Sequence, residues 1–184
     1  MRSRLPLIAA VLSVAALGAP NAAQAATSCA GANVVPTTTN IATVRTATIC
    51  LVNKERTSRG LHALKGAESL HNVAGTYAKR MVRDQFFDHT SPDGGTFVSR
   101  IKRTTYLKGG LRRWDIGENI AWGTGKLASP AEIVNAWMHS AGHRKNILTP
   151  NYNELGMGIA VGAPVSGSKS TGATYVNEFG ERRR

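Results

Sequence analysis

The chain has 184 residues, of which 42% are hydrophobic, and a formal net charge of +12 at pH 7. This length fits one domain with a sizeable core, and the absence of an internal repeat excludes a repeat protein. The charge favours anionic neighbours such as wall polymers, lipid headgroups or nucleic acid, although no nucleic-acid module with its expected spacing is present. A solvated basic surface that aids solubility explains the same charge.

Residues 1–25 predict a signal peptide that is removed on export. Arg2 and Arg4 form a basic n-region, residues 5–17 are an apolar run too short to span a bilayer comfortably, and residues 23–25 read A-Q-A, a cleavage site. Cleavage before Ala26 leaves a charge of +10, because two arginines are lost from +12. The alternative is an uncleaved membrane anchor. No second spanning run follows, so we expect a secreted protein, extracellular or associated with the cell wall.

The only two cysteines, Cys29 and Cys50, predict one disulfide. Both lie in the exported part of the chain, where disulfides persist. The bridge would tie an N-terminal arm, residues 26–43, to the first helix, and closing a loop of about twenty residues stabilises a fold by roughly 3 kcal/mol. The alternative is two free thiols without a catalytic role, since neither cysteine is near a histidine in sequence.

Helical periodicity marks the first half of the chain. A helix is expected from about Val44 to Arg59, where Gly60 ends it. A clearer helix runs to about Asp84, and a short one follows the turn at residues 91–94. The apolar face of the clearer helix has three- and four-residue steps and consists of Leu70, Val73, Ala74, Tyr77, Ala78, Met81 and Val82.

A later helix has a strong start signal. Ser129 can cap it, Pro130 occupies its first position and Glu132 completes a capping box. Gly142 is expected to end this helix. Extended segments are expected at residues 116–122, 155–161 and 173–179, with a Gly/Ser-rich hairpin connection at 162–172. Helices first and strands last predict an α+β fold, a small antiparallel sheet flanked by helices.

Three polar residues are candidates for one site: His89, Glu118 and His143. Two imidazoles and a carboxylate suffice to hold a divalent metal or to move a proton. Each also has a structural explanation. His89 fits a histidine that bonds to carbonyls at a helix end, Glu118 fits a strand residue pointing to solvent, and His143 fits a helix C-terminus stabilised by the dipole.

The other histidines have weaker claims. His62 is next to a glycine turn, His71 is beside the apolar face of a helix, and His139 is expected to face solvent. None repeats the H-E-x-x-H pattern of a metal site. No G-x-S-x-G nucleophile motif is present, and no further general base is evident beside the three candidates.

Four motifs together resemble a known family. They are residues 87–94 (FDHTSPDG), 117–121 (GENIA), 136–148 (AWMHSAGHRKNIL) and 179–180 (FG). In this order they are similar to the CAP superfamily of cysteine-rich secretory, antigen 5 and pathogenesis-related 1 proteins (SCP domain), in its bacterial, YkwD-like secreted branch. The resemblance covers residues 44–180 and leaves a basic tail at 181–184.

The resemblance implies an α-β-α sandwich with a central antiparallel sheet. It also implies a cleft that many eukaryotic members line with a His, Glu, Glu, His tetrad. By motif, His89, Glu118 and His143 occupy three of these positions, and Ser140 replaces the second glutamate. The replacement removes one negative charge and one ligand or base. Some members of the family bind a divalent cation, others bind sterols or fatty acids, and protease activity has been proposed for a few.

We therefore expect a binding module whose cleft holds a divalent metal such as Zn²⁺, or a small ligand from the envelope or a host. His89, Glu118 and His143 are the expected metal ligands and the candidate catalytic residues, with Ser140 and Asn119 beside them as ligand contacts. One alternative is a metal-dependent hydrolase using the same residues. The other is a lipid-binding protein with a groove between helices.

Overall fold

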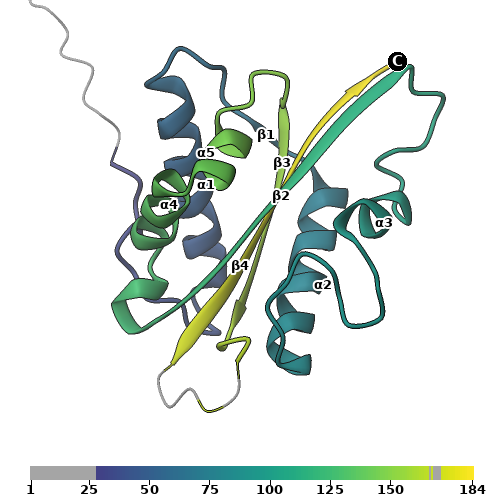
Figure 1. Ribbon diagram of the computed structural model, residues 1–184. Coiled ribbons are helices and arrows are strands. Elements are labelled where there is room, and N and C mark those ends of the chain that lie inside the picture. Colours follow the sequence, from purple (N-terminus) through teal and green to yellow (C-terminus); the bar gives the residue numbers. More distant parts are fainter. Residues whose placement is uncertain (1–27, 166, 168–170) are drawn as a thin grey trace, which may run out of the picture.

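The computed structural model describes residues 28–165, 167 and 171–184, and the predicted signal peptide lies outside them. These residues form an α-β-α sandwich around a four-stranded sheet (Figure 1). The helices are α1 (Ile41–Thr57), α2 (Glu68–Asp84), α3 (Phe97–Lys102), η1 (Gly125–Ala128), α4 (Pro130–His139) and α5 (Ala141–Ile147). The strands are β1 (Lys65–Gly66), β2 (Arg113–Thr124), β3 (Glu154–Val161) and β4 (Gly172–Arg183). None of the helices in the described ranges is long and apolar enough to cross a membrane.

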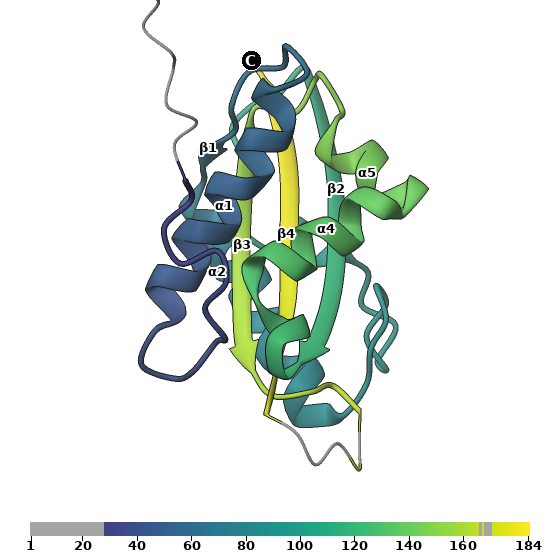
Figure 2. The ribbon, with the colours of Figure 1, turned by 90° about the vertical axis from the view of Figure 1, so that its left-hand side faces the viewer.

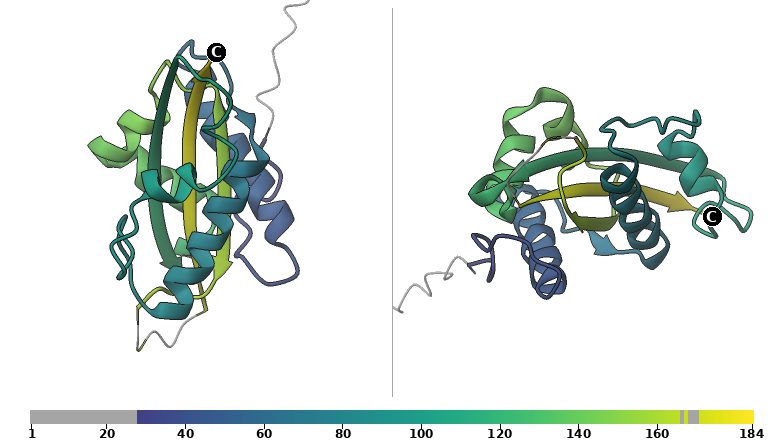
Figure 3. Two further views of the ribbon diagram at one scale, coloured as in Figure 1. Left: turned by 90° about the vertical axis from the view of Figure 1, so that its right-hand side faces the viewer. Right: turned by 90° about the horizontal axis from the view of Figure 1, so that it is seen from below.

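The sheet has the order β1-β3-β4-β2, so β4 is central and β2 is an edge strand. β4 pairs antiparallel with both neighbours, whereas β1 pairs parallel with β3 through Lys65 and Gly66 alone. Figure 2 shows α1, α4 and α5 over one face of the sheet, and the left view of Figure 3 shows α2 and α3 over the other. The predicted α+β sandwich is confirmed.

Helix α2 packs on the sheet through the face that periodicity predicts. Six of the seven predicted side chains are buried, and Val82 is half-buried. Gly156 and Gly158 of β3 permit this close approach, because a Cβ at either position would overlap the main chain of α2 at Leu70 and Ala74. The main chain of α2 therefore lies directly against the main chain of β3, and a side chain at either glycine would separate the two.

Arg56 of α1 is fully buried on the other side of the sheet and is paired with main-chain oxygens. Its guanidinium donates to the carbonyls of His62, Ile147, Thr149 and Tyr152 at 2.7–3.0 Å. These carbonyls belong to the loop after α1, to the last residue of α5 and to the segment that joins α5 to β3. One side chain thus fixes both connections to the end of the first helix.

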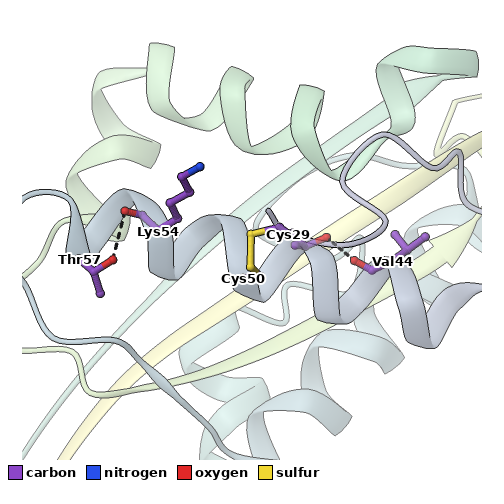
Figure 4. The surroundings of a disulfide bond; sticks show 6 residues. Cys29, Val44, Cys50, Lys54 and Thr57 are labelled. Carbon is purple, nitrogen blue, oxygen red and sulfur yellow. Dashed lines mark hydrogen bonds between the residues drawn. A yellow bond between two sulfur atoms is a disulfide. The ribbon is translucent and has the colours of Figure 1, made fainter. Parts of the chain in front are cut away.

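The predicted disulfide between Cys29 and Cys50 is confirmed, with the two Cα atoms 5.7 Å apart. Figure 4 shows the bridge linking the arm to the middle of α1. The arm is also held by a main-chain hydrogen bond from Ala131 N–H of α4 to the carbonyl of Ala32, 2.8 Å long. The arm therefore joins α1 to α4 on the outside of the sandwich.

Three local expectations need correction. Pro130 does occupy the first turn of α4, but the Ser129 side chain makes no cap hydrogen bond, so the capping box is not formed. The helix ends at His139 because Ser140 is extended, and Gly142 lies inside the next helix, α5. Strand β4 continues to Arg183, because β2 begins early enough to pair with it.

Candidate functional site

The site is built around the edge strand β2, with contributions from both faces of the sheet. Glu118 lies on the face covered by α2 and α3, as do its alternate neighbours Ile116 and Ile120, which pack against residues of those helices. Asn119 points to the opposite face, toward α5. His89 lies in the loop between α2 and α3, and His143 lies in the first turn of α5.

Glu118 and His89 form a direct hydrogen-bonded pair. Nδ1 of His89 lies 2.8 Å from Oε1 of Glu118. The Glu118 side chain is completely buried, whereas 49% of the His89 side chain is exposed. Because a carboxylate oxygen accepts, Nδ1 carries the hydrogen, and in the neutral form of the ring Nε2 has a lone pair. The pair thus presents an oriented imidazole nitrogen that is free of this hydrogen bond.

Arg100 of α3 occupies the other oxygen of Glu118. Its Nη2 donates to Oε2 at 2.6 Å, and its Nη1 donates to the carbonyls of His89 and Gly95 at 3.1 and 2.9 Å. The guanidinium carbon lies 3.2 Å from the centre of the Tyr77 ring. Arg100 therefore compensates the buried carboxylate and also fixes the backbone of the loop that carries His89.

A second buried carboxylate, Glu178, lies beside Glu118. The two residues are direct cross-strand partners in the β2–β4 pair, so their side chains emerge on the same face. Glu178 is fully buried, and neither of its oxygens has a hydrogen-bond partner among the described residues. Burial first, and then the charge of Glu118, raise the pKa of Glu178 well above its ordinary value. Glu178 is therefore protonated at pH values between the ordinary pKa of a glutamate and its own raised pKa.

The main chain of His143 is fastened to β2 from the opposite face of the sheet. Its main-chain carbonyl accepts from Nδ2 of Asn119 at 3.0 Å, and Asn146 of the same helix donates to Oδ1 of Asn119 and to the carbonyl of Glu118 at 2.9 and 3.1 Å. Burial first, and then the charge of His89, lower the pKa of His143. These contacts fasten α5 to β2 and favour a neutral imidazole.

Gly117 explains why the motif at 117–119 begins with glycine. A Cβ there would lie 2.6 Å from the hydroxyl of Tyr152 and 3.2 Å from Oδ1 of Asn146. The Asn146 side chain is held close to β2, because its Nδ2 donates to Oδ1 of Asn119 and to the carbonyl of Glu118. A larger residue would push α5, and His143 with it, away from the strand.

The structure connects His89, Glu118, Asn119 and His143 through one set of neighbouring contacts. Ser140 caps α5 with its backbone, and its side chain makes no cap hydrogen bond. The other three histidines form hydrogen bonds to the main chain. The rings of His62 and His139 bond carbonyls, and Nδ1 of His71 accepts from the N–H of Met157.

Sequence reasoning missed three contributors to the site: Tyr77, Arg100 and Glu178. Tyr77 belongs to the predicted apolar face of α2, and its hydroxyl donates to the carbonyl of Asp88 at 2.6 Å. Arg100 carries no local signal, because its partner is on a later strand. Glu178 does carry one: it interrupts the run of apolar and small residues at 173–180, where a carboxylate is costly to bury.

Chemically, the site offers the half-exposed imidazole of His89, which is backed by the buried Glu118 and Arg100. Glu178, whose pKa is raised, lies beside Glu118, and the partly exposed His143 lies on the neighbouring helix α5. Imidazole nitrogens bind divalent metals, and a carboxylate behind a ligating histidine sets its orientation. Within residues 28–165, 167 and 171–184 no group of three or more His, Cys, Asp or Glu side chains is arranged to hold a metal ion. A metal at this site would therefore depend on the two histidines and on ligands from outside the protein.

Residues 50–176 match the sequence model of the cysteine-rich secretory protein family, CAP. The chain belongs to the CAP family. Two curated relatives from Bacillus subtilis (strain 168) are similar to it. The uncharacterized protein YkwD is 40% identical over 108 residues, which cover 59% of this chain and 39% of YkwD. The uncharacterized membrane protein YlbC is 31% identical over 109 residues, which cover 59% of this chain and 29% of YlbC. The match thus spans well under half of each relative.

Solved structures show the same architecture. An extracellular protein of Bacillus anthracis that contains an SCP domain is 25% identical, with a TM-score of 0.59 over 81% of this chain and 44% of that chain. An outer surface protein of Borrelia burgdorferi is 19% identical, with a TM-score of 0.62 over 81% of this chain and 97% of that chain, and shows the fold alone. A bacterial CAP domain is therefore established from sequence and structure together.

Proposed function

We propose that this CAP domain is an exported binding module whose site at His89, Glu118 and His143 holds a divalent metal or a small ligand. One observation carries the proposal: buried Glu118 bonds Nδ1 of a half-exposed histidine and leaves its Nε2 for a ligand. A carboxylate behind an imidazole is the usual support of a metal-ligating histidine.

The second imidazole supports the same reading. The lowered pKa of His143 favours the neutral form that a metal requires, and α5 is fastened to the strand that carries Glu118. Both oxygens of Glu118 accept hydrogen bonds, so His89 and His143 are the direct ligands we propose, and Glu118 orients the first of them. Zn²⁺ binds imidazole nitrogens, and water or an external donor would have to fill the positions that the two histidines leave open.

Calorimetric titration of Zn²⁺ into the metal-stripped protein tests this proposal. The wild type should bind at one site per chain, and His143→Ala should abolish that binding. His139→Ala is the matched control, since His139 is an exposed residue of α4 whose ring bonds the carbonyl of Asn135 in its own helix. Absence of binding to the wild type would refute the metal site. Peptide or ester turnover that a chelator removes and zinc restores would identify a hydrolase instead of a binding module.

A further inference from the structure

A groove of about 580 Å³ lies between α1 and α2, along the outer edge of β3. It shares no lining residue with the site at His89, so it is a separate feature of the molecule. Figure 2 shows α1 on the near face of β3, with α2 behind the strand. The residues that matter below are Ile41, Arg45, His71, Lys79, Ile159 and Val161.

The floor of this groove is an unpaired strand edge. β1 pairs with β3 only at Glu154 and Leu155, so among the described residues no strand neighbours the outer edge of residues 157–161. The carbonyl of Leu155 accepts from Ala67 on this edge. Along a strand, the N–H and C=O groups of every second residue point to the same side. Ile159 and Val161 are therefore expected to direct these groups outward, as Leu155 does.

His71 marks the point where the pairing stops. Its Nδ1 accepts from the N–H of Met157 at 2.9 Å, which satisfies the first outward N–H after the end of β1. Beyond it, Ile159 and Val161 both line the groove. An exposed edge of this kind is a ready template for an added strand, and natural proteins usually cover it or blunt it with charge.

The walls of the groove are basic. Among its described lining residues, Arg45, Lys79 and Arg83 are positive, and Glu68 alone is negative. Arg83 is already paired with Asp84. Arg45 is half-buried, and its Nε has no hydrogen-bond partner within the described residues. The apolar floor contributed by Ile41 and Ile159 lies between these charges.

We propose that this groove binds an extended, acidic segment of a partner polypeptide, which adds to the sheet alongside β3. Main-chain hydrogen bonds to Ile159 and Val161 would supply affinity, and alternate side chains of the segment would meet the apolar floor and the basic walls. A fatty acyl chain would leave the edge N–H and C=O groups without partners, so the unpaired edge favours a peptide. This proposal is independent of the metal site.

Selection from a random heptapeptide display library on the purified full chain tests it, because the library does not presuppose a sequence. Enriched peptides should alternate apolar and other residues and contain Asp or Glu. Lys79→Glu should weaken the best peptide about fivefold, as expected for one exposed ion pair of about 1 kcal/mol. The matched control is Lys126→Glu in η1, an exposed lysine outside the groove, which should change affinity less than twofold.

Two further readouts identify strand addition itself. The amide hydrogens of Ile159 and Val161 should exchange more slowly with solvent when the peptide is bound. N-methylation of the peptide amides that face β3 should weaken binding about tenfold, because it removes one or two hydrogen bonds. N-methylation of the alternate amides, which face away from β3, should have little effect. These variants alter the peptide alone, so the fold of the protein is not at risk.

The proposal is wrong if no peptide is enriched, if Lys79→Glu binds the selected peptide as tightly as wild type, or if both N-methylated peptides bind alike. It is also wrong if sodium myristate, and no peptide, shifts the NMR signals of the groove residues. That last result would identify the groove as a lipid site.

Discussion

Replacing Glu178 with glutamine should stabilise the protein, and increasingly so as the pH rises. Glu178 is fully buried next to Glu118, and its pKa is raised well above the ordinary value. In the unfolded chain the same carboxyl ionises near pH 4.3. Above that pH, folding must therefore take up a proton, and stability that is present at low pH is lost until the native pKa is reached.

The size of this loss follows from the linkage relation. Each pH unit between the unfolded and native pKa values costs about 1.4 kcal/mol. Between pH 5 and pH 7 the wild type should therefore lose up to about 2.7 kcal/mol relative to Glu178→Gln, which has the shape of the protonated residue and binds no proton. The amide can also donate to Glu118, as the protonated carboxyl can.

Urea unfolding at pH 5, 6 and 7 measures this difference, provided that the transitions are two-state at each pH. Glu132→Gln, an exposed position on α4, is the control and should give a difference that does not change with pH. A Glu178→Gln effect that is constant between pH 5 and pH 7 would refute the assignment of a protonated, buried glutamate.

Three further predictions concern the framework and the site. Arg56→Met should destabilise the fold by about 3 kcal/mol or more in urea unfolding, because it removes four buried or partly buried hydrogen bonds to main-chain carbonyls, whereas Arg59→Met on the surface should change stability by about 0.5 kcal/mol or less. Replacing both cysteines of the disulfide with serine should cost about 3 kcal/mol by the same assay, and no change would show that the arm is held without it. Glu118→Gln should weaken zinc binding about 10- to 100-fold in calorimetry, and unchanged affinity would show that Glu118 does not support the ligand.

The fold was largely predictable because its elements carry local signals. The three- and four-residue steps of α2 are readable in sequence and agree with the structure. The extended segments expected at residues 155–161 and 173–179 lie within β3 and β4. β1 was not predictable, because two residues have no period and its pairing depends on the distant Glu154 and Leu155. Helix α5 was missed because Gly142 is a helix-stop signal, and packing against β2 overrides it.

The site was predictable in its motif residues and not in their partners. Glu118 interrupts an apolar stretch, and His89 and His143 belong to the family motifs at 87–94 and 136–148, which makes all three visible in sequence. The contact between Glu118 and Arg100 joins two elements that no local pattern connects, and the cross-strand position of Glu178 depends on the register between β2 and β4. Because Ser140 stands where the family has its second glutamate, the sequence indicated a single carboxyl in the site. The structure shows a second one, since Glu178 lies beside Glu118 on the neighbouring strand.

The ¹⁵N spectrum of the histidine rings, recorded before and after one equivalent of Zn²⁺, tests the central claim most directly. Without zinc, His89 should carry its hydrogen on Nδ1, the atom bonded to Glu118. With zinc, the Nε2 signal of His89 and one nitrogen of His143 should shift together, while His139 stays unchanged. A His89 ring with its hydrogen on Nε2, or zinc-induced shifts confined to other histidines, would contradict the proposed site.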